Sequence, residues 1–253
     1  MNRDRVMLVT GASGSIGQVI ARGAAADGWS VIAHGRTMAS AERAAAMLRA
    51  HVPEARVAPA ACDFIEEGAI AALIDRIAAD HGRLDGIANC AVSAPPGVVG
   101  AFARTDPSAY TAFCHHALTT LQWLCFAAFP LMAKGGGGSL VALSSDAGRF
   151  AAPNQSLIAT TRAGIMAFVR NIALEASRDR IRVNCVSATY VESTSIVDKL
   201  EAAGNTRIEA ARKRAGLGLP HAEDIANIAL FLLGPGSTRL TGQVISVNGG
   251  LNS

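Results

Sequence analysis

The chain has 253 residues, half of them hydrophobic and 5% aromatic, so a large core can be built from Ala, Val, Leu and Ile. Its formal net charge is +3, and the scattered Lys and Arg form no basic block, which argues against nucleic-acid binding. Five cysteines without CxxC spacing predict reduced, buried thiols in a cytoplasmic protein, and no residue cluster predicts a metal site.

The first residues contain only a very short apolar run before Thr10, which fits no signal peptide. The most apolar helical stretch, 117–133, is short for a membrane span and is interrupted by polar residues and Pro130. We therefore expect a buried or interface helix here and no membrane association.

Apolar runs of strand length alternate with helical patterns along the whole chain. The predicted strands cover 6–10, 29–34, 56–60, 84–91, 140–144, 181–187 and 244–247. The predicted helices cover 15–27, 39–50, 69–79, 107–133 and 155–178, with helical segments around 195–215 and 222–232. This alternation predicts one α/β domain over 1–253, a doubly wound parallel sheet with helices on both faces. Residues 192–219, inserted before the last helix and strand, are the predicted substrate lid.

A glycine-rich turn joins the first predicted strand to its helix, with the sequence TGASGSIG at 10–17. Glycines at such a turn allow the backbone to approach a pyrophosphate, which then lies at the helix N-terminus among unpaired N–H groups. The turn predicts a dinucleotide site; its predicted contacts are Gly11, Ser13, Ser15, Ile16 and Gly17.

The end of the second predicted strand indicates which dinucleotide is bound. An NAD site usually has Asp or Glu there to bind the adenosine ribose, but this strand ends His34-Gly35-Arg36-Thr37. The planar guanidinium of Arg36 can pair with a 2′-phosphate, so NADP(H) is the predicted cofactor. A solvated surface arginine is the alternative interpretation.

These features and others resemble the short-chain dehydrogenase/reductase family over nearly the whole chain. The further marks are Cys62-Asp63-Phe64, Leu84-Asp85-Gly86, Asn89-Cys90-Ala91, Ser144-Ser145-Asp146-Ala147-Gly148, Ile181-Arg182-Val183-Asn184, Thr241-Gly242-Gln243-Val244 and Asn248-Gly249-Gly250. The resemblance implies that Asp63 and Phe64 contact the adenine, Asn89 and Ala91 the adenosine side, and Val191 the nicotinamide amide.

The family's catalytic residues are an Asn, a Ser, a Tyr and, four residues after the Tyr, a Lys. Only the serine matches, as Ser145, which is expected to polarise the substrate oxygen. Ile158 stands where the Tyr is expected, Arg162 where the Lys is expected, and Ala117, beside His116, where the Asn is expected. An isoleucine cannot donate a proton, so the usual mechanism is excluded. Arg162 is still expected to contact the nicotinamide ribose.

The proton needed for carbonyl reduction then has three possible sources. It can come from the substrate, for example from a phenol adjacent to the ketone, with Ser145 orienting the oxygen. It can come from His115 or His116, although a solvent-facing or core histidine is the commoner role on such a helix. Tyr190, Tyr110 or an ordered water is the third source.

Family members that lack the Tyr include atypical ketoreductases of aromatic polyketide antibiotic pathways, which this chain resembles. The predicted substrate is therefore a flat aromatic ketone, in a pocket that includes Ser93, Ile158 and Tyr190. A non-catalytic NADP(H) sensor or regulatory protein is the alternative, and an isomerase or dehydratase on the same scaffold is a third hypothesis. The resemblance also implies a homodimer or homotetramer formed through the helices at 107–133 and 155–178.

Overall fold

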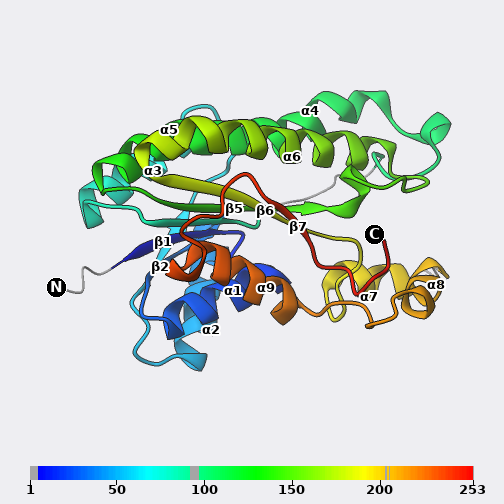
Figure 1. Ribbon diagram of the computed structural model, residues 1–253, viewed down its shortest axis with the longest axis horizontal. Helices are drawn as coiled ribbons and strands as arrows, with labels where there is room; N and C mark the ends of the chain where they lie inside the picture. Colours follow the sequence, from blue (N-terminus) through cyan, green and yellow to red (C-terminus); the bar gives the residue numbers. More distant parts are fainter. Residues whose placement is uncertain (1–4, 92–96, 203, 205, 253) are drawn as a thin grey trace.

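The computed structural model of the protein describes residues 5–91, 97–202, 204 and 206–252; the predicted pocket residue Ser93 lies outside them. Seven parallel strands form one sheet in the order β3-β2-β1-β4-β5-β6-β7 (Figure 1). The strands are β1 (Val6–Thr10), β2 (Ser30–Gly35), β3 (Val57–Ala61), β4 (Gly86–Asn89), β5 (Gly138–Ser145), β6 (Ile181–Ala188) and β7 (Val244–Ser246). Helices cover both faces, so the predicted doubly wound fold is confirmed.

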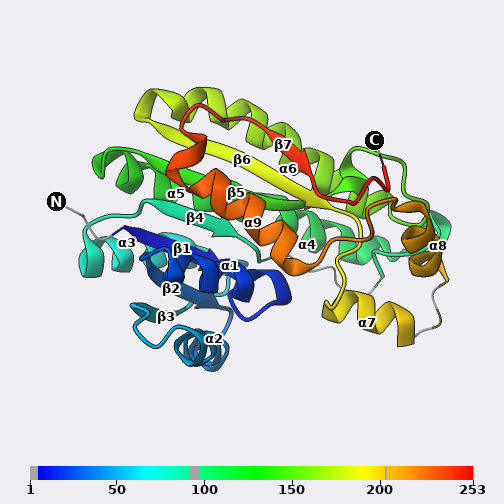
Figure 2. The same ribbon diagram turned by 60° about the horizontal axis from the view of Figure 1, so that its bottom comes forward.

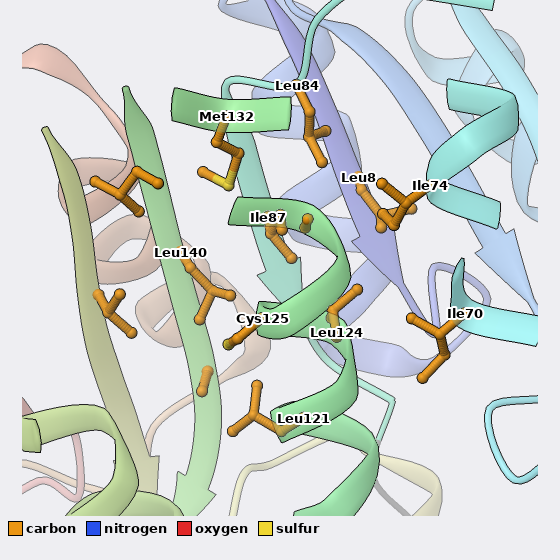
Figure 3. Close-up of a cluster of buried hydrophobic side chains, with 14 of the residues drawn as sticks. Leu8, Ile70, Ile74, Leu84, Ile87, Leu121, Leu124, Cys125, Met132 and Leu140 are labelled. Carbon is orange, nitrogen blue, oxygen red and sulfur yellow. The ribbon is translucent and has the colours of Figure 1, made fainter. Parts of the chain in front are cut away.

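The two helical layers hold two hydrophobic cores. Figure 1 shows one face covered by α1 (Ser15–Ala26), α2 (Met38–His51) and α9 (Ala222–Leu233), and the other by α3 (Ala69–His81), α5 (Thr120–Lys134) and α6 (Ser156–Ala176). In the second core, Leu121 and Leu124 of α5 pack toward Leu140 of β5 and Ile87 of β4 (Figure 3). Apolar residues three and four positions apart along α5 and α6 produce the stripes that face the sheet.

The strand order reverses between β1 and β4, and this reversal determines where a ligand can bind. Thr10 at the end of β1 is paired in register with Asn89 at the end of β4. Connections leave these two strands toward opposite sides, so a crevice forms outside their carboxyl ends.

The predicted long helix at 107–133 is not one regular helix. It consists of a 3₁₀ turn (Pro107–Ala109), α4 (Tyr110–Cys114), a π-helical turn (His115–Thr119) and α5. Apolar spacing does not distinguish a π-helical turn from α-helix, which is why the sequence did not predict it. Such turns often occur at functional sites, and this one contains both His115 and His116.

Two other element boundaries differ from prediction for identifiable reasons. The strand expected at 84–91 ends at Asn89, because the N–H groups of Cys90 and Ala91 donate to the Thr10 hydroxyl instead of continuing the ladder. The helical segment expected at 195–215 is divided into α7 (Ser195–Ala202) and α8 (Arg207–Arg214), which lie together beyond the carboxyl ends of the strands (Figure 2).

Two helical stretches are long and apolar enough to cross a membrane by length and composition, Pro107–Lys134 and Ser156–Asp179, with mean hydropathies of 1.2 and 1.3. Both contribute buried residues to the core against the sheet. In the two stretches, 44% and 39% of the most apolar window is buried inside the structure, so packing on the sheet covers part of their apolar surface.

The cysteines are mostly, but not all, buried. Cys62, Cys125 and Cys185 are buried, Cys90 is half-buried and Cys114 on α4 is exposed, so the prediction of a buried thiol is wrong for Cys114. All five are free thiols. Burial raises the pKa of Cys185 to about 12, which keeps that thiol protonated.

At the amino ends of the strands, polar side chains join the sheet to its connections. Asp85 accepts hydrogen bonds from the Val6 amide (2.9 Å) and from Nε of Arg83 (2.8 Å). At the start of β6, Arg182 donates to the carbonyl oxygens of Leu232 (2.6 Å) and Gly234 (3.1 Å). The two bonds from Arg182 satisfy carbonyls at the end of α9 that lack helical partners.

Candidate active site

Five buried polar residues lie at the carboxyl ends of the strands. Each is the last or penultimate residue of a strand or directly follows one: Thr10, His34, Asn89, Asp146 and Ser187. Because the strands are parallel, all of these ends meet at one edge of the sheet.

The Thr10 hydroxyl is the centre of the contact between β1 and β4. It donates to Oδ1 of Asn89 (2.9 Å) and accepts from the N–H groups of Cys90 and Ala91 (3.0 Å each). A Cβ built on Gly11 would lie 3.1 Å from Cα of Ala91. The structure thus brings the predicted cofactor residues Asn89 and Ala91 directly beside the glycine-rich turn.

The backbone of the glycine-rich turn is packed too closely for side chains at two positions. Gly11 has φ +62°, and a Cβ on Gly17 would lie 2.3 Å from the Gly11 carbonyl oxygen, so both positions need glycine. Helix α1 begins at Ser15, and no acidic residue lies in its first turn. Ser13 is exposed, Ser15 is half-buried, and Ile16 packs on the core. These residues fit a dinucleotide pyrophosphate.

The residues predicted for the adenosine side lie at the ends of β2 and β3. Arg36 directly follows β2 and is exposed, while Thr37 caps α2. Asp63 is half-buried, and Phe64 is buried with its ring stacked on His34 at 4.4 Å between centroids. Arg36 is therefore available to a phosphate at the sheet edge, whereas Phe64 is mostly covered by protein.

Ser145 ends β5, half-buried, and its Oγ accepts a hydrogen bond from the Ala147 amide (3.3 Å). Next to it is an apolar cluster in which Ile158 packs with Ala117 and Ala147; Val98 and Phe113 complete it. The two positions predicted to replace the Tyr and Asn, Ile158 and Ala117, thus belong to a single buried apolar wall.

Arg162 lies one turn of α6 after Ile158 and is only 5% exposed. Among the residues that the structure describes, its Nη1 has no hydrogen-bond partner. Burial lowers the pKa of this guanidinium to about 10, so it is still charged at neutral pH. This nitrogen has room in its hydrogen-bonding capacity for an acceptor from a ligand or a water molecule.

The two histidines of the π-helical turn have different surroundings. The His115 ring packs edge-on against Trp123, with 4.8 Å between centroids. Burial lowers the pKa of His116, Asp63 opposes this shift, and Arg162 reinforces it. A neutral His116 at pH 7 is a poor source of an imidazolium proton.

A cavity of about 270 Å³ opens beside the residues that follow Ser145. Its lining includes Ala147, which also contacts the Ile158 cluster, and Tyr190, together with Arg207 and Arg214 of α8. Val191, predicted to contact the cofactor amide, is buried, and its carbonyl accepts from the Thr194 hydroxyl (2.7 Å). The lining of the cavity therefore combines apolar side chains with two arginines of α8.

Asp146 is one of the residues that line this cavity, and it has a structural role that the sequence did not predict. Its carboxylate accepts from the hydroxyls of Ser187 (2.6 Å) and Ser246 (2.8 and 2.7 Å) and from Nδ2 of Asn248 (2.7 Å). It thereby joins the ends of β5, β6 and β7. An acidic residue directly after an apolar strand is the signal that could have indicated a buried network.

Comparisons with known proteins agree with this geometry. A family model described as enoyl-(acyl carrier protein) reductase matches residues 11–252. The 3-oxoacyl-(acyl-carrier-protein) reductase of Chlamydia trachomatis is 28% identical over 251 residues, covering 98% of this chain and 97% of the relative. The cis-4-hydroxycyclohexanecarboxylate dehydrogenase of Sinomonas cyclohexanicum is 30% identical over 250 residues, covering 98% and 96%. A short-chain type dehydrogenase/reductase of Mycobacterium ulcerans superposes with a TM-score of 0.90 at 28% identity, covering 98% of this chain and 90% of that one.

Replacing Thr10 with Val should lower the free energy of unfolding by about 3 kcal/mol, because it leaves the buried Asn89 oxygen and two backbone N–H groups without a partner. Urea unfolding followed by circular dichroism would measure the loss. In the control Thr160→Val, an exposed hydroxyl that bonds its own helix is removed, and the change should stay within about 0.5 kcal/mol. Equal losses in the two variants would show that Thr10 has no special role.

Proposed function

The chain belongs to the short-chain dehydrogenase/reductase family of oxidoreductases, and from this we propose that it is an NADPH-dependent ketoreductase of polycyclic aromatic ketones that works without a tyrosine acid. The observation that carries the proposal is the buried apolar wall of Ile158 and Ala117 near Ser145. Such a wall suits a flat ring and provides no proton donor at the two positions where the family resemblance implies a Tyr and an Asn.

The NADP(H) assignment is supported by three features. The glycine-rich turn offers a cradle for the pyrophosphate, Arg36 stands at the end of β2 where NAD sites carry an acid, and Nη1 of Arg162 is buried without a partner among the described residues. We propose that Arg36 binds the 2′-phosphate and that Arg162 binds the nicotinamide ribose. Asn89 and Ala91 would contact the adenosine side, Asp63 and Phe64 the adenine, and Val191 the nicotinamide amide. When bound, NADPH supplies a hydride to the carbonyl carbon.

In the proposed reaction, the residues of the chain stabilise the negative charge on the substrate carbonyl oxygen, and none of them supplies the proton. The Ser145 hydroxyl, held by the Ala147 amide, donates a hydrogen bond to the substrate carbonyl oxygen, on which negative charge develops as the hydride arrives. The resulting alkoxide takes its proton from the phenol hydroxyl adjacent to it on the same substrate. The phenolate left behind regains a proton from the solvent, so the net reaction consumes one hydride from NADPH and one solvent proton.

The cavity and the segment above it are the proposed substrate chamber and lid. We propose that Tyr190 lines the substrate pocket and that 192–219 closes over it. Arg212 of α8 pairs with Glu192 (2.6 Å), with Glu201 of α7 (2.6 Å) and with Glu209 (2.6 Å), so one guanidinium joins both ends of this segment. The lid would move as a unit because its two helices share this cation.

Because it lacks the tyrosine acid, the chain resembles atypical ketoreductases of aromatic polyketide antibiotic pathways, in particular the angucyclinone ketoreductase of simocyclinone biosynthesis. We propose a comparable role for this chain, as a cytoplasmic enzyme in antibiotic biosynthesis.

We also propose that the protein is a homodimer or homotetramer. The outer surfaces of α5 and α6 expose Phe126 (85%) and Leu174 (72%), and a groove between the helices is lined by Phe129, Phe168 and Ile172. A monomer would leave this apolar patch in water. A second copy with the same face would cover it.

The proposed chemistry predicts that turnover depends on a phenol in the substrate. NADPH oxidation, followed by absorbance, should occur with polycyclic ketones that carry an adjacent phenol and should be absent or much slower with matched ketones whose phenol is methylated. NADPH binding without oxidation of any ketone would instead favour a non-catalytic sensor.

The role of Ser145 is checked with the same substrates. Ser145→Ala should slow turnover about a hundredfold, the usual effect of removing one donor to the developing oxyanion, without abolishing it. Complete loss of turnover with unchanged NADPH binding would mean that Ser145 relays the proton and that the substrate does not supply it.

Arg36→Ala should weaken NADPH binding about 10- to 100-fold, the value of charge-assisted bonds to a phosphate, and leave NADH binding unchanged. Isothermal titration calorimetry with both dinucleotides would measure this. Arg178→Ala, which removes an exposed arginine after α6, is the matched control and should change neither. Equal weakening of NADPH and NADH by Arg36→Ala would contradict the assignment.

Phe126→Asp should convert the oligomer into a smaller species, because it places a charge in the proposed apolar interface. Light scattering after size-exclusion chromatography would give the mass of each species. Met47→Asp on α2, which is 40% exposed on the opposite helical layer, should leave the mass unchanged. An unchanged mass for Phe126→Asp would mean that this face is not the interface.

A further inference from the structure

After its first residue, β2 consists of apolar residues and glycine except for His34, whose ring contacts two other segments of the chain. His34 is 3% exposed. The Gly11 amide donates to its Nδ1 (3.3 Å), and its Nε2 lies 2.8 Å from the Cys62 carbonyl oxygen. Its face stacks on Phe64. One imidazole thus connects the glycine-rich turn with the loop that follows β3.

The two hydrogen-bond partners define the protonation state of the ring. A backbone N–H only donates and a carbonyl oxygen only accepts, so Nδ1 must carry a lone pair and Nε2 the single proton. A second proton would place the N–H of Nδ1 against the Gly11 N–H. The neutral ring is the only form that makes both bonds.

The surroundings agree with a neutral ring. Burial lowers the pKa of His34, and the bond to the Cys62 carbonyl and the Asp63 carboxylate oppose this shift. Asp63, in the loop after β3, is the acid that faces His34, and Arg36 lies two residues after His34 in the chain. The Cys62 thiol is uncharged, because burial raises its pKa to about 11. The turn at 10–17 contains no charged or titratable side chain, and its polar side chains are the hydroxyls of Thr10, Ser13 and Ser15.

Building on the proposed NADPH function, we propose that His34 is a positioning residue whose neutral ring holds the Gly11 turn and the Cys62–Phe64 loop in the geometry that receives the adenosine half of the cofactor. His34 itself is buried beneath both segments and need not touch the dinucleotide. Protonation of the ring breaks the bond to Gly11 and loosens the turn. Cofactor binding should therefore weaken as the pH falls.

The same linkage acts on the cofactor-free protein. Since the pKa of His34 is lower in the folded chain than its ordinary value of 6.5, the unfolded chain takes up the proton first as the pH falls. The stability from the neutral ring is complete above about pH 6.5 and is lost as the pH falls toward the folded pKa.

The test compares His34→Gln with His34→Ala. A glutamine amide can donate to the Cys62 carbonyl and accept from the Gly11 amide, but it does not titrate. Dissociation constants for NADPH and NADH would be measured by cofactor fluorescence between about pH 5.5 and 8.5. NADH is included because the 2′-phosphate of NADPH itself titrates near pH 6. His51→Gln, at an exposed histidine at the end of α2, is the control.

The parent and His51→Gln should bind NADH progressively more weakly as the pH falls, up to about three- to tenfold once the ring is protonated, which is the value of one lost hydrogen bond. His34→Gln should bind like the parent at the alkaline end and show a flat pH profile. His34→Ala should bind about three- to tenfold more weakly at the alkaline end. In the absence of cofactor, the thermal midpoint of His34→Gln should fall less than that of the parent on acidification.

Three outcomes would overturn the inference. Parent-like binding by His34→Ala at the alkaline end would remove the positioning role. A parent-like pH profile in His34→Gln, or an equal fall of its thermal midpoint, would remove the protonation effect. A parent protein that binds neither dinucleotide at any pH would contradict the proposed function itself, an outcome that differs from the other two because it does not depend on His34.

Discussion

The contact between the ends of β1 and β4 is the constraint on which the rest of the site depends. In a sheet whose order reverses there, two chain segments leave side by side and in opposite directions. The Thr10 hydroxyl holds the two segments together, because it accepts hydrogen bonds from the N–H groups of Cys90 and Ala91, which therefore do not pair with a neighbouring strand. This close approach is also why position 11 needs glycine, because Ala91 is an immediate neighbour of its backbone and would be too close to a Cβ atom. The crevice therefore follows from hydrogen bonding at the strand ends as much as from the glycines.

The fold was predictable because it depends on repeated, local signals. Buried parallel strands must be continuously apolar, as in Val6–Thr10, and each is separated from the next by a helix with one apolar stripe. The predicted boundaries were wrong where a tertiary contact determines the end of an element, as at Cys90 and Ala91. The π-helical turn at His115–Thr119 was not predicted for a different reason, because it has no distinct periodicity in the sequence.

Sequence reasoning could name candidate site residues but not what surrounds them. The glycines, Arg36, Ser145 and the isoleucine at 158 all follow from short motifs. The packing of Ile158 against Ala117 requires two segments about forty positions apart to meet, which no local pattern encodes. The partners of His34 and Asp146 come from several strands for the same reason. Three-dimensional neighbours, rather than residue types, distinguish these two side chains from ordinary buried polar groups.

The polar bonds at the two ends of the sheet divide the molecule in a way that concerns protein engineering. Asp85 and Arg182 secure the amino edge, away from every residue assigned to ligand contact. Substitutions that strengthen that edge could raise thermal tolerance without disturbing the chamber. Libraries restricted to 147–155 and 192–219 would in turn explore new ligand shapes on an unchanged framework. The architecture thus separates robustness from evolvability, and the two can be selected in successive rounds.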